Sequence, residues 1–461
     1  MLNLKNYNIR DTIAAIATFP AKSGLGVIKI SGKKALAIAH KIFKPAKLKD
    51  IRKAKTFTLH YGYIRDKTKI VDEVLVSVMK GPASYTREDT IEISSHGGPY
   101  VSERILKLVL KQGARLAQPG EFTYRAFIHG RLDLTQAQSV AAITEAGCDQ
   151  ALVQALAQLE GSVSREIIEI KESLKEVYAR TEAQINFPED APGLSGEVLG
   201  RRLKPLAGKV EALIAESQAG RILNEGFRCC ICGRTNTGKS TLFNRFLREE
   251  RVIVSHIPGT TRDVLDETIN VKGVPIRIYD TAGILKARDV IEEKALVKTR
   301  QAFAGADLVL VLIDGSRPLS RDDQQLLKQS RDKNSIIVIN KSDLAQKISD
   351  KDIRGLGRPV LKFSALKSQS LAILEKAILR CIARTGVVRQ DAVFLSRYQE
   401  AALVKISKGL KQALGYLACG QGVDMIDLTL AGCLEELGKL SGEVASSAIL
   451  EEIFSKFCIG K

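Results

Sequence analysis

The sequence of 461 residues contains no tryptophan, only 5% aromatic residues and no run of eighteen apolar residues. The last absence argues against a membrane-spanning helix. The first residues also lack the charged-then-apolar order of a secretory signal. The 8 cysteines have no histidine nearby, which argues against a structural zinc site and favours free thiols. From these absences we expect a cytoplasmic protein without a membrane partner.

Positive charge is in excess, with 70 Lys and Arg against 52 Asp and Glu and a net charge of +18. This excess favours a polyanionic partner, with nucleic acid the first choice. A basic stretch such as residues 33–55 also fits an ordinary solvated face, so charge alone leaves both interpretations open. The length suffices for about three domains.

A phosphate-binding pattern lies near the middle of the chain, where an apolar run leads into G-x-x-x-x-G-K-S at residues 233–240. The run predicts a buried strand, and residues 241–247 predict a helix. Gly233 and Gly238 let backbone N–H groups surround phosphates at the helix N-terminus. Lys239 supplies a positive charge to the β- and γ-phosphates, and the Ser240 hydroxyl suits Mg²⁺. This order predicts a nucleotide site.

Three further short motifs each follow a predicted strand. Residues 280–283 place a carboxylate and a glycine where Mg²⁺ and the γ-phosphate are contacted. In residues 340–343, an aspartate can accept both N–H donors of guanine, which adenine does not offer. Residues 364–366 can offer backbone N–H groups to the base oxygen. The four motifs in this order predict GTP rather than ATP, and they resemble those of the small GTPase superfamily.

The catalytic residues are less direct to assign. Ile284 stands where Ras-like enzymes place the glutamine that orients water, so we expect a nearby carboxylate, Asp289, Glu292 or Glu293, to take that role. Asn236 and residues 255–263 can ligate a monovalent cation near the phosphates, although Asn236 could instead only brace the loop. The Thr-Thr pair at residues 260–261 supplies a second Mg²⁺ hydroxyl when the loop closes on the triphosphate.

Outside the nucleotide module, strands are predicted over 12–17, 26–31, 74–79 and 90–94, with helices over 34–43 and 99–112. Apolar residues recur at spacings of three and four over 132–183, over 203–222 and again after residue 388. These stripes suggest one helical domain interrupted by the nucleotide module. Spectrin-like rods or separate bundles also fit the periodicity.

The chain resembles the tRNA modification GTPase family called MnmE or TrmE. The resemblance covers nearly the whole sequence and is carried by residues 24–32, 94–98, 119–127, 185–189, 259–263 and the ending Phe-Cys-Ile-Gly-Lys. It implies a multidomain fold of α/β and all-α parts. The implied segments are an α+β domain at 1–125 that binds tetrahydrofolate and dimerises, a discontinuous helical domain at 126–225 and 388–461, and an inserted Ras-like P-loop GTPase domain at 226–387.

The resemblance also implies an activity. Members work with the flavoprotein MnmG on wobble uridine 34 of certain tRNAs. They install an aminomethyl or carboxymethylaminomethyl group at C5, with 5,10-methylenetetrahydrofolate as one-carbon donor and 5-formyltetrahydrofolate as an analogue. Hydrolysis of GTP by the homodimer needs Mg²⁺ and is stimulated by K⁺. The alternative is a regulatory GTPase switch in ribosome assembly or signalling, without a role in tRNA modification.

Carried over to this sequence, the resemblance assigns Mg²⁺ to Ser240 and Thr261, and K⁺ to Asn236, Ser255, Ile257 and Thr260. Glu292 takes the water-orienting role, beside Thr261, Lys239 and Cys458 as further catalytic residues. Folate contacts are Lys29, Glu92, Arg131 and Lys461. The residues predicted to bind GTP are Asn236, Thr237, Gly238, Lys239, Ser240, Thr241, Ser255, His256, Ile257, Pro258, Gly259, Thr260, Thr261, Asp280, Thr281, Ala282, Gly283, Asn340, Lys341, Ser342, Asp343, Ser364, Ala365 and Leu366.

Overall fold

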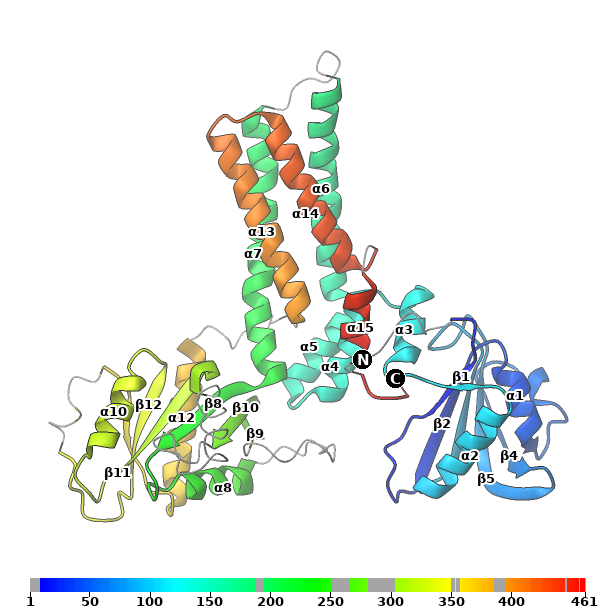
Figure 1. The fold of residues 1–461 in the computed structure, drawn as a ribbon, viewed down its shortest axis with the longest axis horizontal. Helices are drawn as coiled ribbons and strands as arrows, with labels where there is room; N and C mark the ends of the chain where they lie inside the picture. The colour runs from blue at the N-terminus through cyan, green and yellow to red at the C-terminus, as the bar shows by residue number, and fades with distance from the viewer. Residues whose placement is uncertain are drawn as a thin grey trace, which may run out of the picture. The chain divides into compact units, whose positions relative to one another are not determined.

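The computed structural model describes residues 9–187, 195–250, 266–280, 303–349, 353, 357–384, 393, 395–443, 446–455 and 457–460. By its internal contacts the chain divides into two compact units (Figure 1). The first unit comprises Met1–Thr144, Ala157–Val210 and Ala401–Lys461, and the second comprises Glu145–Leu156 and Glu211–Glu400. The predicted boundaries at residues 125, 225 and 387 stay predictions.

The first unit begins with a seven-stranded sheet in which every pair is antiparallel except β1 with β7. Helices α1 (Ala35–Ile42) and α2 (Pro99–Lys111) pack on one face. The strands in sheet order are β3 (Phe43–Pro45), β4 (Thr58–Asp66), β5 (Lys69–Met79), β6 (Thr90–His96), β2 (Leu25–Ser31), β1 (Ile13–Ile16) and β7 (Arg115–Leu116).

Alternation along the strands decides which face is buried. In β5, Val74, Val76 and Val78 are buried under the helices, whereas Leu75 points to the other face and is 40% exposed. We call this other face the open face of the sheet. The strands and helices predicted for this region are confirmed within a few residues. The short strands β3 and β7 and the long strand β4 were not predicted.

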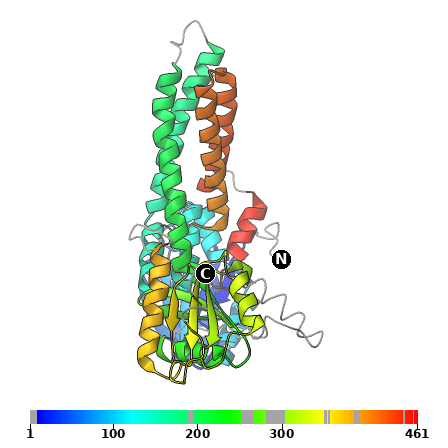
Figure 2. The same cartoon turned by 90° about the vertical axis from the view of Figure 1, so that its left-hand side faces the viewer.

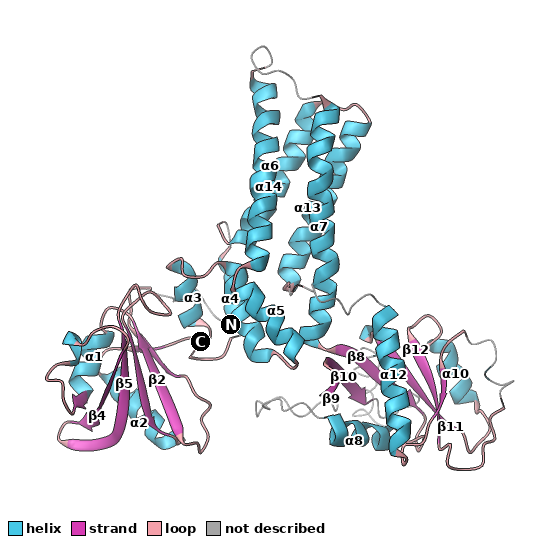
Figure 3. Ribbon diagram, turned by 180° about the vertical axis from the view of Figure 1, so that it is seen from behind, coloured by secondary structure: helices cyan, strands magenta, loops and turns pink. Residues whose placement is uncertain are grey.

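The rest of the first unit is helical. Helix α6 (Ser162–Asn186) packs on α14 (Val423–Ser441), and the Thr181 hydroxyl donates to Asp427 across 2.6 Å. Figure 3 shows α6 beside α14 and α7 (Gly196–Glu225) beside α13 (Arg397–Ala418). Segments before and after the nucleotide module therefore pack together. This confirms one discontinuous helical domain and decides against separate bundles.

The region 132–183, predicted to be helical, contains three helices. They are α4 (Leu134–Glu145), α5 (Asp149–Leu159) and α6, with Gly161 in the left-handed region (φ 86°) just before α6. Helices α3 (Glu121–Ile128) and α15 (Ser447–Ser455) also belong to the first unit, whereas most of α5 lies in the second. Among the described residues, none of the helices combines the length and apolar character needed to cross a membrane.

The second unit contains a six-stranded sheet that is parallel except for the pair β9 and β10. Lys272 and Gly273 both have positive φ, 50° and 89°, as a tight hairpin turn between β9 and β10 requires. The strands in sheet order are β13 (Val360–Lys362), β12 (Ser335–Asn340), β11 (Leu308–Asp314), β8 (Phe227–Gly233), β10 (Val274–Asp280) and β9 (Asp266–Val271).

Helices cover both faces of this sheet, which is why its central strands are continuously apolar. Helices α8 (Lys239–Glu250) and α12 (Ser368–Arg384) pack on one face. Helix α10 (Arg321–Gln329) packs on the other, and Figure 2 shows α12 and α10 on opposite sides of the strands. The sheet of the second unit is therefore mostly parallel and covered by helices on both faces. Together the two units confirm the multidomain fold of α/β and helical parts.

Candidate functional site

The phosphate loop connects β8 to α8, and its glycines are required by close contacts. A Cβ atom on Gly233 would lie 2.5 Å from the carbonyl oxygen of Leu312 on the neighbouring strand. Gly238 has φ 97°, and a Cβ there would collide with the side-chain amide of Asn340. Asn236 also has a positive φ, 65°, and its side chain is exposed. The loop is therefore held in a shape that only glycine permits at two positions.

Lys239, the first residue of α8, extends back over the loop. Its ammonium donates to the carbonyl oxygens of Gly233 and Arg234, at 2.9 and 2.8 Å, and the residue is 7% exposed. A positive charge thus lies at the centre of the loop, at the N-terminus of a helix, where the macrodipole also favours an anion. The next two residues, Ser240 and Thr241, are exposed and present hydroxyl groups at the same helix start.

Asn340 joins three segments of the site. Its side-chain amide donates to the carbonyl oxygen of Thr237 across 2.7 Å, and its side-chain oxygen accepts from the backbone N–H of Ala365 at 3.1 Å. Asn340 is 2% exposed, so these bonds satisfy its polar atoms away from water. The phosphate loop and the two later motifs are therefore one connected structure.

Asp343 lies beside the end of β12, and Ser364 donates a 2.6 Å hydrogen bond to its Oδ1 atom. This hydrogen bond, supported by a backbone one, lowers the pKa of Asp343, which keeps the exposed carboxylate ionised. An ionised carboxylate accepts two N–H donors, as the recognition of guanine requires. Ser364 and Ala365 are buried, whereas Leu366 is 75% exposed.

Lys341 is in the left-handed region, with φ 62°, and its ammonium lies 2.6 Å from Asp314 Oδ2. Asp314 ends β11 and pairs in register with Asn340. Burial acts to raise the pKa of Asp314, but hydrogen bonds from Lys341 and from Ser316 outweigh burial, and the net pKa is lowered. The carboxylate therefore fixes the direction of the Lys341 side chain. Ser342 donates its backbone N–H to Phe363.

Several predicted site residues fall outside the described part of the chain or have no described side chain. These are Ser255, His256, Ile257, Pro258, Gly259, Thr260, Thr261, Asp280, Thr281, Ala282, Gly283, Glu292 and Lys461. Of the candidate cation ligands, Ser240 and Asn236 are described. Both expose oxygen atoms at the phosphate loop, and oxygen is the donor that Mg²⁺ and K⁺ prefer. Among the described residues no cluster of three His, Cys, Asp or Glu side chains suits a metal.

A second polar cluster lies on the open face of the first sheet. Lys29 on β2 and Glu92 on β6 pair in register, and their charged groups are 3.5 Å apart. The Lys29 ammonium lies 5.6 Å from the centre of the Tyr85 ring and 5.5 Å from that of Phe122. Arg131 lies over the same Tyr85 ring at 4.6 Å. The structure thus brings together three of the four residues predicted to contact folate.

Tyr85 holds this cluster to α3. Its hydroxyl is 3.0 Å from the Thr123 hydroxyl, and burial raises the pKa of the phenol, so the ring stays neutral at ordinary pH. Two cations therefore lie at a partly buried aromatic ring, and one of them pairs with a carboxylate. Such a set suits a flat, polar heterocycle that also carries negative charge.

Helix α3 is fixed by a buried ion-pair network. Arg125, 1% exposed, contacts Glu88 at 3.0 Å and Glu121 at 3.1 Å, and it donates to the backbone oxygen of Asp11. Arg115 also binds Glu121, with one guanidinium nitrogen 2.7 Å from the Oε1 atom that Arg125 contacts and another 3.1 Å from Oε2. Each buried carboxylate therefore faces a guanidinium, as buried charge requires.

The C-terminal segment returns to this region. The backbone oxygen of Cys458 accepts from the N–H of Gly120, 3.4 Å away, and Phe457 packs in the cluster that contains Tyr124 and Phe454. A Cβ on Gly460, which has φ 98°, would lie 2.8 Å from the Cα of Ala17, so the segment passes close to the end of β1. Cys458 is an exposed free cysteine. The backbone of Cys458 is thus hydrogen-bonded to Gly120, which lies two residues before Phe122 of the second cluster.

Comparison with known proteins decides the family. The family model described as "MnmE helical domain" matches residues 134–458, and that described as "GTP-binding protein TrmE N-terminus" matches residues 12–131. The "tRNA modification GTPase MnmE" of Thermoanaerobacter pseudethanolicus is 42% identical over 457 residues, covering 98% of this chain and 99% of that protein. This chain belongs to the MnmE family.

Other MnmE proteins agree with this assignment. Those of Lactococcus lactis subsp. cremoris and Clostridioides difficile are each 40% identical, cover 98% of this chain, and are themselves covered to 98% and 100%. Among solved structures, the Era protein of Aquifex aeolicus covers 39% of this chain and is covered to 65%, at 27% identity. Its TM-score of 0.27 is too low to support a conclusion.

For this MnmE family member, sequence reasoning missed Asp314, Tyr85, Thr123 and the contacts of Arg125. Asp314 could have been found from the sequence. It ends one apolar run, Asn340 ends the next, and the ends of neighbouring parallel strands lie at the same edge of a sheet. Tyr85 gave no comparable signal. It lies in an irregular segment between β5 and β6, and its partners are far away in the sequence.

Proposed function

We propose that this chain hydrolyses GTP and takes part in the modification of tRNA. The observation that carries the proposal is the connection of Asn340 to both the phosphate loop and the segment of Ser364, beside an ionised Asp343. This connection supports a phosphate cradle and a guanine acceptor at one edge of a parallel sheet. The relatives are named tRNA modification GTPases, and this supports the part of the proposal that concerns tRNA. Phosphate release with GTP and with ATP tests the proposal directly, and equal rates would contradict it.

Mg²⁺ and K⁺ are the proposed cofactors of hydrolysis. Ser240 and Thr261 would hold Mg²⁺, while Asn236 with Ser255, Ile257 and Thr260 would hold K⁺. The ions would supply positive charge to the leaving phosphate, and Glu292 would orient the attacking water. We expect faster turnover in KCl than in NaCl, and Asn236→Ala should remove that difference while Ser240→Ala reduces turnover in both salts. Equal turnover of the unmodified protein in the two salts would reject the K⁺ site.

The Lys29, Glu92 and Arg131 cluster is the proposed site for the reduced folate, with Lys461 as a fourth contact. The chemistry supports this, because Glu92 can accept from a pterin edge while cations suit the glutamate tail. Calorimetry with 5-formyltetrahydrofolate tests it on the full chain. Glu92→Gln and Arg131→Ala should each weaken binding roughly tenfold, and Arg131→Lys should weaken it less. Unchanged affinity in both Glu92→Gln and Arg131→Ala would exclude this site.

The reaction we propose is the modification at C5 of wobble uridine 34, performed by a homodimer together with MnmG in the cytoplasm. Methylenetetrahydrofolate would supply the carbon, and Cys458 would act close to it. Nucleoside mass spectrometry of tRNA from cells lacking the protein tests the reaction, since the modified uridine should disappear and return with the gene. Intact modification in those cells, with GTP hydrolysis retained by the purified chain, would instead indicate a regulatory GTPase.

A further inference from the structure

The basic stretch at residues 33–55 has no role in either site described above. It contains nine cations and a single acidic residue, Asp50, and all nine cations are exposed. Asp50 already pairs with Arg52 at 2.7 Å and with His40 at 3.2 Å. The other eight cations form no ion pair with any described residue. They are Lys33, Lys34, Lys41, Lys44, Lys47, Lys49, Lys53 and Lys55.

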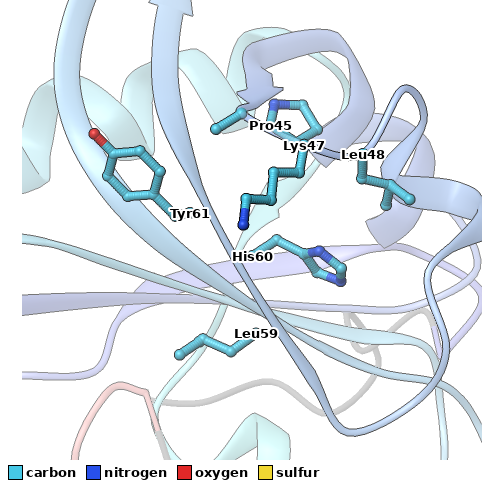
Figure 4. Close-up of a pocket in the computed structure, with 7 residues that line it drawn as sticks. Pro45, Lys47, Leu48, Leu59, His60 and Tyr61 are labelled. Atoms are coloured by element: carbon cyan, nitrogen blue, oxygen red, sulfur yellow. The ribbon is translucent and has the colours of Figure 1, made fainter.

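A pocket of about 430 Å³ opens within this stretch, where the chain leaves β3 and passes β4. The segments 45–48 and 59–61 line it, and the backbone N–H of Ala46 donates to the oxygen of Tyr61, which fixes one segment against the other. In Figure 4 the Lys47 side chain extends toward the space between Tyr61 and His60. The remaining walls are largely apolar. A volume of this order accommodates a small planar ligand.

The aromatic wall is held in a fixed orientation. The Tyr61 hydroxyl donates to Glu73 Oε1 across 2.9 Å and is 3.0 Å from the Tyr63 hydroxyl, and the two rings meet edge to face at 5.8 Å. Tyr61 is nevertheless 44% exposed, so one side of its ring is open to a ligand.

The register of the sheet places two residues of the pocket wall, Leu59 and Tyr61, on the same face as the Lys29 cluster. Lys29 pairs with Glu92, Glu92 with Ser77, and Ser77 with Leu59, which lines the pocket. These four residues form one row across β2, β6, β5 and β4. Since neighbouring strands are about 4.8 Å apart, Leu59 lies roughly 14 Å from Lys29 along the row.

Cations without partners beside an exposed, oriented aromatic ring are the features that bind single-stranded nucleic acid. The cations contact phosphates, and the ring stacks on an unpaired base. We propose that this pocket, together with Lys44 and Lys47, binds an unpaired segment of RNA. The inference rests on the proposed function, because it names the surface on which the tRNA is held near the folate cluster.

The test is tRNA binding by the full chain, measured by fluorescence anisotropy with a labelled tRNA transcript at several salt concentrations. We expect Lys44→Glu combined with Lys47→Glu to weaken binding at least about tenfold at low salt. The slope of log affinity against log salt should also fall by about 1.4, corresponding to two lost phosphate contacts on a single strand. The matched control, Lys204→Glu with Lys408→Glu, makes the same charge change on exposed helical positions and should stay within about threefold.

The aromatic contact has its own pair of variants. Tyr61→Ala should weaken tRNA binding by roughly five- to 100-fold, whereas Tyr61→Phe keeps the ring and should bind like the unmodified chain. Urea denaturation of every variant should match that of the unmodified chain, which shows that the first unit is folded. GTP hydrolysis, which belongs to the second unit, should be unchanged and separates this inference from the proposed function.

Three results would overturn the inference. One is an equal loss of binding in the Lys44/Lys47 variant and in the Lys204/Lys408 control. Another is tRNA binding by Tyr61→Ala that matches the unmodified chain. The third is loss of binding to phosphatidylglycerol vesicles, but not to tRNA, in the Lys44/Lys47 variant. None of these results would decide the proposed function. That function is tested separately by GTP turnover and by mass spectrometry of the wobble nucleoside in tRNA from cells lacking the protein.

Discussion

The two sheets of this protein are built from similar apolar strands but present their polar groups in different places. The parallel sheet of the second unit is covered on both faces, so ligand-binding groups are available only at the ends of its strands. The antiparallel sheet of the first unit is covered by α1 and α2 on one face, and its polar cluster lies across the open face. How a sheet is covered therefore decides where a ligand can bind.

The two sites also differ in the interactions that keep their residues in position. The phosphate loop depends on backbone geometry and on one lysine that contacts two carbonyl oxygens. The Lys29 cluster depends on side chains from distant parts of the chain, positioned by the buried Arg125 network. We expect damage to the first site to affect chemistry with little effect on stability. Damage to the support of the second should affect the fold.

The sharpest test of this difference is Lys239→Ala. It removes the positive charge at the centre of the loop, so we expect GTP hydrolysis to fall on the order of 10²-fold or more. Unfolding of the chain, followed by circular dichroism, should change little. Lys376→Ala, an exposed substitution on α12, is the matched control and should hydrolyse GTP normally. Near-normal hydrolysis by Lys239→Ala would show that this lysine is not required for GTP hydrolysis.

The converse test is Arg125→Met in the first unit. It leaves Glu88 and Glu121 without their shared cation in a buried position, which should cost about 3–5 kcal/mol of stability. Urea denaturation measures this loss, and nucleotide binding by the second unit should persist. The control Arg201→Met removes a pair with Glu197 in which both side chains are 75% exposed, and it should cost less than about 1 kcal/mol. Equal losses would show that burial does not distinguish the two pairs.

A smaller effect is expected from Asp314→Asn, which removes the ion pair that orients Lys341. We expect GDP affinity to fall roughly three- to 30-fold, since hydrogen bonds between charged groups are worth about 1.5–3 kcal/mol and part of that is recovered from solvent. Because the pKa of Asp314 is lowered, its pair contributes above the ordinary pKa of about 4 and is lost only as the pH falls through the lower folded value. Affinity of the unmodified chain should therefore not weaken through this group between pH 8 and 5.

The corresponding control for Asp314 is Ser316→Ala. It removes a hydrogen bond to the carboxylate but leaves Lys341 paired, and its effect should be clearly smaller. Titration calorimetry with GDP measures both variants. If Asp314→Asn bound GDP as tightly as the unmodified chain, the orientation of Lys341 would not matter for the base.

The smallest effect concerns the exposed rim of the first sheet. His96 is hydrogen-bonded to Asp72 across 2.7 Å, and this bond raises the histidine pKa. A raised pKa means that the stabilisation is fully present below the ordinary value of about 6.5 and is lost as the pH rises through the folded value. Asp72→Asn should lower the His96 pKa in an NMR titration. If the His96 pKa did not change in this variant, a group other than Asp72 would be the cause of its raised value.

The phosphate loop could be predicted from sequence because its chemistry is local. Gly233, Gly238, Lys239 and Ser240 lie within eight positions, and their spacing alone fixes the loop. The guanine motifs were equally accessible, since each follows an apolar strand. The fold class followed from the same periodicities.

Contacts between distant residues could not be predicted in this way. Arg125 meets Glu88 across 37 positions, and Thr123 meets Tyr85 across 38, with no periodic pattern linking them. Strand β4 escaped notice because His60 and Gly62 interrupt its apolar alternation. Such residues are selected by tertiary packing, which local propensity does not encode.

The pairing of α6 with α14 has a consequence for synthesis of the chain. Lys171 meets Glu443, 272 positions later, and Thr181 meets Asp427, 246 positions later. At ribosomal rates of about 5–20 residues per second, α14 is therefore synthesised on the order of 12 to 50 s after α6. Throughout that interval the buried stripe of α6, which includes Ile167, Ile170 and Leu174, needs a temporary cover. Nascent chains of this protein are thus natural clients for chaperones that shield apolar helices.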